Sequence, residues 1–191
     1  MSYYEILLFL HIAAAVTWLG SAFFLQALVF RADRTNDTLL TRQLTGHTEW
    51  LARRIFIPVS LLVLVFGILL TIEGPWSFDQ LWILLGLAGY AVSFLVGIGL
   101  IEPEAKKIHA AMEAHGPESP QAAHHLRRIN LISRMELVVL YLVVAVMALK
   151  PTADDTGTLI LLAATVLATL ALGLPKLRTP APEGRLAATA D

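Results

Sequence analysis

The sequence has no cysteine and few charged residues. Charged side chains make up 15% of its 191 residues, whereas soluble domains carry about 25%. Without cysteine the chain forms no disulfide, has no thiol nucleophile and holds no cysteine-ligated metal or cluster. It also lacks a glycine-rich phosphate loop, a paired-histidine zinc motif and a serine nucleophile elbow. No basic patch interleaved with aromatic residues is present, which excludes nucleic acid as a partner.

Hydrophobic residues are abundant instead, at 57% of the chain, with a mean hydropathy of +0.68. A helix needs about 20 mostly apolar residues to cross the hydrocarbon core of a bilayer. Four runs meet this length or nearly so: 5–30, 55–72, 81–101 and 158–174. The run 137–149 has only 13 residues. It must include the preceding INLISRME to span the membrane, which places Arg134 and Glu136 inside it.

The loops between these runs alternate in positive charge. Lys and Arg number five in 31–54, none in 73–80, four in 102–128, one in the short loop that begins at Lys150, and three in the tail. Positively charged loops stay in the cytoplasm. The pattern therefore predicts a bacterial inner-membrane protein with its N-terminus outside and its C-terminus in the cytoplasm.

The predicted fold is an all-α, polytopic membrane protein with one transmembrane domain, 1–174. Its five helices are predicted at about 4–30, 55–72, 81–101, 129–149 and 158–174. The first four form a four-helix bundle and the fifth lies at its side. The third helix is predicted to continue beyond the membrane and to break between Gly116 and Pro120. The Pro- and Ala-rich segment 175–191 is predicted to be a disordered cytoplasmic tail.

His11 interrupts the first apolar run. At about 1.5 Å of rise per residue it lies about 10 Å below the outer edge of the membrane. The residues on its face of the helix are Ala15, Trp18, Ala22 and Val29. Because an imidazole is costly in lipid, this face is predicted to look into the bundle. Tyr90 and Tyr141 are predicted at the same depth, beside a seam of small residues in the third helix.

Two interpretations of His11 remain open. In the first, His11 only packs, through a hydrogen bond to Tyr90, Tyr141 or a backbone carbonyl. In the second, it ligates the iron of a b-type haem, and Trp18 and the small residues of the third helix line the porphyrin. The other histidines lie in cytoplasmic loops, so Met147 is the candidate second ligand. A lone intramembrane histidine favours the packing role until a cofactor is shown.

The stretch HIAAAVTWLG resembles the first helix of a loose group of bacterial membrane proteins: CopD copper-resistance proteins, HemJ-type protoporphyrinogen oxidases and the membrane domain of PuuD-type urate oxidases. The chain more closely resembles domain-of-unknown-function family 2269, in LHIAAAVTWLG, LWILLG and SRMELVVLYLVVAVMALKP, over about residues 5–151. The HemJ-type resemblance implies haem at His11. Those enzymes also need a lysine in the third helix, whereas here the first lysine after Trp82 is Lys106.

A second set of polar residues is predicted in the cytoplasmic half. Arg134 and Glu136 are two residues apart and point to opposite faces of one helix, so each needs another partner. Glu136 is predicted near the depth of Gln26 and of Arg53 or Arg54, and Arg134 is predicted to reach headgroups or Glu102. The favoured interpretation is a structural ion-pair lock, and the alternative is a proton or substrate path.

Two functions follow from these residues. One is a haem-binding, redox-associated membrane protein with His11 as ligand. The other is a non-enzymatic membrane subunit or small transporter in which His11, Tyr90 and Tyr141 only pack. Whether the chain is an enzyme stays open. The expected partners are the lipid bilayer and either a second copy of the chain or another membrane subunit.

Overall fold

A computed structural model of the chain describes residues 2–35, 37–116 and 118–178. Over these residues the chain is helical and contains no strand. Five helices in this part are long and apolar enough to cross a membrane: Tyr3–Thr35, Ala52–Glu73, Leu81–His115, Pro120–Leu149 and Thr156–Leu177. The predictions of an all-α fold and of five membrane spans are confirmed.

Several spans are built from more than one element. The order is α1 (Tyr3–Thr35), α2 (Thr38–Leu51), the π-helix η1 (Ala52–Phe56), α3 (Ile57–Glu73), α4 (Leu81–Val96), the π-helix η2 (Gly97–Ile101), α5 (Glu102–His115), α6 (Pro120–Leu149) and α7 (Thr156–Leu177). The helices are longer than predicted, and 175–177 complete α7. Arg178 is the C-cap of α7, and the remaining residues of the predicted tail, 179–191, lie outside the described residues.

Turn residues end the helices where the local sequence requires. Gly116 has φ +88° after α5, a conformation that glycine adopts at little cost. Ser119 then caps α6 by accepting a hydrogen bond from the Ala122 amide, and Pro120 opens the helix. The predicted break between Gly116 and Pro120 is confirmed. Before α7, the backbone and hydroxyl of Thr152 both donate to Asp155, which lowers the pKa of that carboxyl.

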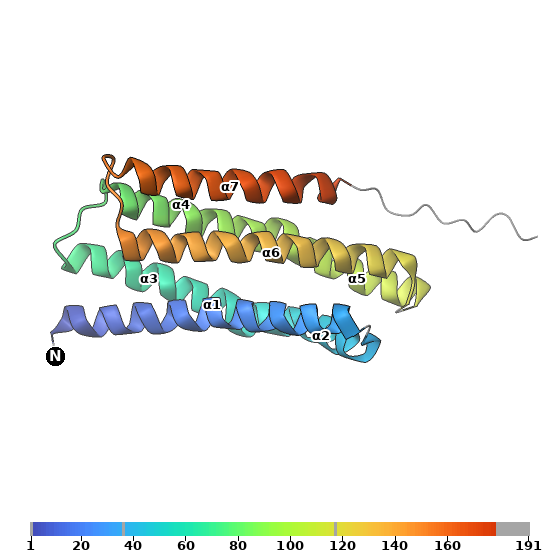
Figure 1. Cartoon of the computed structure of the whole chain (residues 1–191). Helices are drawn as coiled ribbons and strands as arrows, with labels where there is room; N and C mark the ends of the chain where they lie inside the picture. The colour runs from blue at the N-terminus through green and yellow to red at the C-terminus, as the bar shows by residue number, and fades with distance from the viewer. Residues whose placement is uncertain (1, 36, 117, 179–191) are drawn as a thin grey trace, which may run out of the picture.

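The spans pack as two antiparallel pairs. α1 packs along α3, and α4 packs along α6, which also contacts α1. Figure 1 shows these four helices side by side, with α7 at the edge of the bundle against α6. Small residues bring α4 and α6 together, because Met147 lies over Gly86 and Val143 lies over Gly89. The four-helix core with a peripheral fifth helix agrees with the prediction.

A cluster of aromatic residues ties the spans at the end where α1 begins. The Trp76 indole donates to the Tyr4 hydroxyl over 3.4 Å, and the Trp76 and Trp82 ring centroids are 5.2 Å apart. The Lys150 ammonium lies 4.0 Å from the Trp76 ring centroid and 5.2 Å from that of Trp82. These contacts join α1, the α3–α4 loop, α4 and the end of α6, and cation–π pairing adds to their strength.

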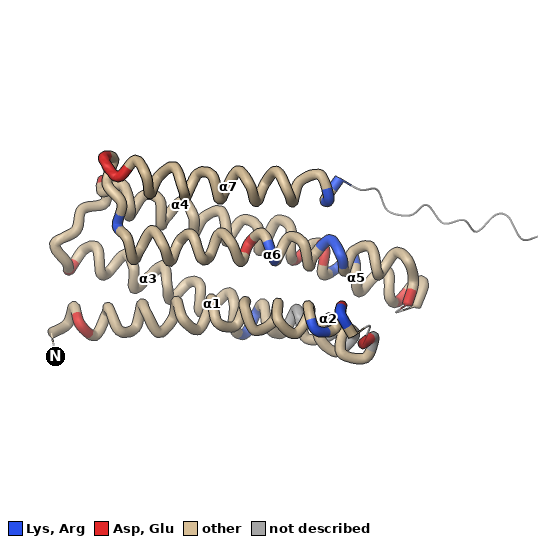
Figure 2. The backbone as a smooth tube through the Cα atoms, in the orientation of Figure 1, with Lys and Arg blue, Asp and Glu red and all other residues tan. Residues whose placement is uncertain are grey.

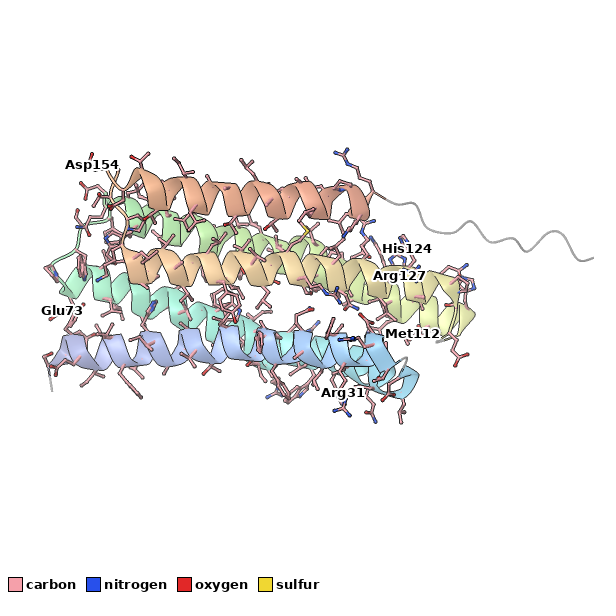
Figure 3. The ribbon with its side chains drawn as sticks, viewed as in Figure 1. Arg31, Glu73, Met112, His124, Arg127 and Asp154 are labelled. Atoms are coloured by element: carbon pink, nitrogen blue, oxygen red, sulfur yellow. The ribbon has the colours of Figure 1, made fainter. Side chains whose placement is uncertain are left out.

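The opposite end carries most of the Lys and Arg residues, as the blue segments of Figure 2 show. We call it the basic end. In Figure 3, Arg31, Met112, His124 and Arg127 lie toward this end, whereas Glu73 and Asp154 lie at the other end. The segregation follows the loop charges of the sequence. The assignment of the basic end to the cytoplasm stays a prediction.

Candidate ligand cavity in the basic half of the bundle

A cavity of about 480 Å³ lies in the basic half, between the α1–α3 pair and the α4–α6 pair. Its wall is largely apolar and includes three aromatic rings, those of Trp18, Phe56 and Phe94. Five uncharged or acidic polar residues from the spans also line it: Gln26, Ser60, Ser93, Ser133 and Glu136. The wall near the basic end also includes four charged or titratable residues: Arg53, Glu102, Lys106 and His109. Such a volume is in the range of small-molecule sites.

Both π-helices line this cavity. Ala52, Arg53 and Phe56 of η1 and Gly97, Ile98 and Ile101 of η2 belong to its wall. In each case the residue that follows the π-helix donates its amide five residues back, from Ile57 to Ala52 and from Glu102 to Gly97. Single π-turns inside helices are frequent at functional sites.

A proline explains each π-turn. Pro58 follows η1 by two residues, and Pro103 follows η2 by two residues. Proline has no amide to donate, and its ring clashes with the carbonyl four residues earlier in an α-helix. Widening the preceding turn relieves that clash. The two prolines are the sequence signal that could have predicted both π-turns.

Glu136 and Ser93 form the polar centre of the cavity wall. The Ser93 hydroxyl, on buried α4 surface, donates to Glu136 Oε1 on α6 over 2.9 Å. This is the one polar contact that Glu136 makes among the described residues. Gln26 Oε1 on α1 is buried and has no hydrogen-bond partner among the residues that the structure describes. Buried polar atoms are normally paired, so an unpaired one marks a place for water or a ligand.

The predicted ion pairs in this half differ from those found. Arg134 contacts Asp33 of α1 at 3.3 Å, and the predicted partner Glu102 instead pairs with Lys106 at 2.8 Å. The reason is that Arg134 and Glu136 leave α6 on different sides, and only the Glu136 side faces the cavity. The predicted neighbours Gln26 and Arg53 do line the cavity with Glu136. Arg54 is exposed and is not part of its wall.

His11 packs between α1 and α3. Its Nδ1 lies 3.0 Å from the Val63 carbonyl oxygen, and its ring fills the space beside Gly67. A backbone carbonyl was one of the partners predicted for His11, and Val63 supplies it. The cavity of the basic half begins two turns further along α1, at Trp18, and does not include His11.

The other residues predicted around a haem lie on different interfaces. Trp18 and Tyr90 do meet, edge to face, with ring centroids 5.9 Å apart, and Tyr90 also stacks on Phe94. Met147 lies over Gly86 in the α4–α6 interface. Tyr141 is 48% exposed on the outside of the bundle. Over the residues that the structure describes, no group of three His, Asp or Glu side chains could hold a metal ion.

A second polar cluster, which the sequence analysis missed, joins α5 to α6 at the basic end. The Glu104 side chain is only 4% exposed and contacts Lys107 at 2.9 Å, His125 at 2.8 Å and Arg128 at 3.5 Å. His125 and Arg128 belong to a loop-and-helix segment that the sequence places beyond the membrane. They turn inward because Glu104 of α5 packs against this side of α6 and would otherwise be a buried carboxylate without partners.

Several apolar helices that are long enough to cross a membrane, with polar segments between them, define a multi-pass integral membrane protein. The chain belongs to the family described as predicted integral membrane protein (DUF2269), which matches residues 5–151. Every residue of the cavity wall lies in this range, whereas α7 lies beyond it. No curated protein and no solved structure matches the chain.

Proposed function

We propose that this membrane protein binds a small molecule with an apolar body in the cavity of its basic half. Glu136 and Ser93 are its polar contacts. The observation that carries the proposal is a cavity of about 480 Å³ in which a carboxyl group meets an apolar, aromatic wall. Such a site suits a binding protein or a small transporter. We place it in the bacterial inner membrane, as the loop charges predict.

The energetics of the bilayer support this proposal. A carboxyl group deep in a membrane bundle is costly, and such residues mark substrate or ion pathways by default. Glu136 could have been satisfied by charged neighbours, as Glu104 is. It faces open space instead, with only Ser93 as a described polar partner. A bound molecule would occupy that space and supply further partners.

The absence of cysteine gives a direct test. Ser60→Cys and Ser133→Cys each place one thiol in the cavity wall. Leu62→Cys and Leu84→Cys are controls on the exposed outer surface of α3 and α4. Water-soluble methanethiosulfonate reagents, one bearing ammonium and one sulfonate, react only with thiols that reach water. We expect the cavity thiols to react and the outer thiols to stay unreactive in lipid nanodiscs. Equal, slow labelling at all four positions would contradict a ligand cavity.

A cavity-filling pair sharpens the test. Gly97 lines the cavity and a Cβ there meets no atom within 4 Å, so Gly97→Phe should fit into the open space. Gly99 also has free space but lies outside the cavity wall. Gly97→Phe should slow the labelling of Ser133→Cys by about tenfold, because an aromatic ring removes the space the reagent needs. Gly99→Phe should leave the labelling rate unchanged.

A b-type haem held by His11 is the second proposal. The hydrogen bond between His11 Nδ1 and the Val63 carbonyl supports it, because a ligating histidine uses its second nitrogen in this way and keeps Nε2 for the metal. Bound haem would supply one-electron chemistry. Met147 lies over Gly86 and Tyr141 is exposed, so this proposal keeps His11 alone as the iron ligand and drops the predicted set of five.

A spectrum tests the haem proposal. Protein expressed with excess haem should show a Soret band that His11→Ala abolishes, while Met147→Leu should leave it unchanged because Met147 packs on α4. The helices should stay inserted in His11→Ala, since apolar length drives insertion. A wild-type protein without a Soret band would exclude this proposal and leave the cavity proposal intact.

A further inference from the structure

We infer that the cavity binds an organic cation, an ammonium group on an aromatic or aliphatic body, and that Glu136 holds the ammonium. This inference rests on the proposed function, because it names the chemical class of ligand for the same cavity. It comes from the hydrogen-bond directions in the wall, from the charge partners of the lining residues, and from the aromatic rings.

Two of the three serine hydroxyls of the wall, those of Ser93 and Ser60, have already used their hydrogens. Ser93 donates to Glu136, and Ser60 donates to the Ile57 carbonyl over 3.0 Å. A hydroxyl has one hydrogen to donate, so both oxygens face a ligand only as acceptors. An ionised carboxylate is also only an acceptor. Glu136, Ser93 and Ser60 therefore favour a ligand that donates hydrogen bonds.

The charges of the wall favour a cation over a neutral donor. Arg53 and Lys106 line the cavity near the basic end, and Lys106 pairs with Glu102 at 2.8 Å. Glu136 is left with the neutral Ser93 hydroxyl as its described contact. An ionised carboxylate in low dielectric is stable only when a positive charge lies close to it. A ligand ammonium would supply both the charge and the donors.

The apolar part of the wall suits the rest of such a ligand. Trp18, Phe56 and Phe94 come from three different elements, α1, η1 and α4. A cation within about 6 Å of an aromatic face is attracted to it, and more strongly when water is excluded. The same rings bury an aromatic body. An amphipathic amine therefore matches each part of the wall.

The test compares two reagents of opposite charge at one thiol. With Ser133→Cys, the ammonium methanethiosulfonate should react at least about tenfold faster than the sulfonate reagent, after correction for their rates with a free thiol. Adding Glu136→Gln should remove this preference. Ser93→Ala, which keeps the carboxyl, should retain it and serves as the control should Glu136→Gln fold poorly. Lack of reaction with both reagents would overturn the proposed function itself. Reaction without a charge preference would overturn only the cation inference.

Protection from labelling tests the ligand class directly. 2-Phenylethylamine, 2-phenylethanol and phenylacetate have similar bodies and differ in the charge of the polar end. At neutral pH the amine should slow the sulfonate labelling of Ser133→Cys in a saturable way, and the alcohol and the carboxylate should not. Glu136→Gln should abolish that protection. Equal protection by the alcohol would show that a neutral donor suffices and would overturn the inference, as would no protection by the amine.

Discussion

At the scale of single residues, two polar side chains in apolar helices have opposite surroundings. His11 is held by a backbone carbonyl of α3 and packs on Gly67, so its polar nitrogen is satisfied inside the protein. Glu136 faces a cavity and has one hydroxyl partner among the described residues. The difference arises from the neighbours. A glycine lets α3 approach His11, whereas the two π-turns line the open space before Glu136.

The packing of His11 predicts a loss of stability when it is removed. His11→Ala should lower the free energy of unfolding by about 1–3 kcal/mol, through a lost interhelical hydrogen bond and a small void beside Gly67. Unfolding by sodium dodecyl sulfate in mixed micelles measures it. His11→Asn, which keeps a donor, should recover part of the loss. Wild-type stability in His11→Ala would mean that the bond to Val63 contributes nothing.

At the scale of elements, prolines shape the helices that line the cavity. Pro58 and Pro103 stand two residues after η1 and η2, and each π-turn adds a residue to the turn before the proline. An extra residue rotates everything that follows relative to a regular α-helix. The side chains of Arg53, Phe56 and Ile101 thus face the cavity because of prolines that lie outside its wall.

Replacing these prolines should close the π-turns. Pro58→Ala and Pro103→Ala restore an amide and remove a ring clash, which should raise the free energy of unfolding by up to about 3 kcal/mol. They should also change the labelling rate of Ser133→Cys, since the wall residues rotate. Pro175→Ala, inside α7 and away from the cavity, is the matched control and should leave labelling unchanged. Unaltered labelling in both variants would show that the π-turns do not determine the shape of the cavity wall.

The α4–α6 contact depends on small residues. A Cβ at Gly86 would collide with the end of the Met147 side chain, and one at Gly89 with Val143. Gly86→Val should therefore lower the free energy of unfolding by about 1–3 kcal/mol through overpacking. Met147→Ala in the same chain should relieve the collision and restore part of the stability. Gly20→Val, at a position with no atom within 4 Å, should have little effect.

At the scale of the whole molecule, charge is divided between the two ends of the bundle. The basic end carries Arg31 (Figure 3), the α5–α6 cluster around Glu104, and the charged residues that line the cavity near that end. The other end is closed by the contacts of Tyr4, Trp76, Trp82 and Lys150. If the basic end faces the cytoplasm, the cavity lies nearer to the cytoplasm than to the outside.

Reporter fusions test this orientation. Fusions at 73–79 and at 151–156 should report the outside, and fusions at 104–115 or after residue 178 should report the cytoplasm, because positive loops resist translocation. Alkaline phosphatase and green fluorescent protein supply opposite signals at each site. An inverted pattern would place the cavity mouth on the outer side and would exclude cytoplasmic molecules as its ligands.

The sequence by itself determined the membrane class, the five spans and the break after Gly116. The physical reason is that each depends on local chemistry: apolar length sets a span, and glycine and proline set a turn. It also predicted that Gln26 and either Arg53 or Arg54 lie near the depth of Glu136, because helical rise converts residue number into depth. Gln26 and Arg53 line one cavity with Glu136, and Arg54 does not.

Only the tertiary structure decided which surfaces meet. Periodicity places His11 and Trp18 on one face of α1, but it does not say that His11 meets α3 while Trp18 meets Tyr90 of α4. Arg134 finds Asp33 on a helix distant in sequence, for the same reason. The cavity requires all four core helices, and the π-turns that line it break the 3.6-residue period on which the sequence argument relied.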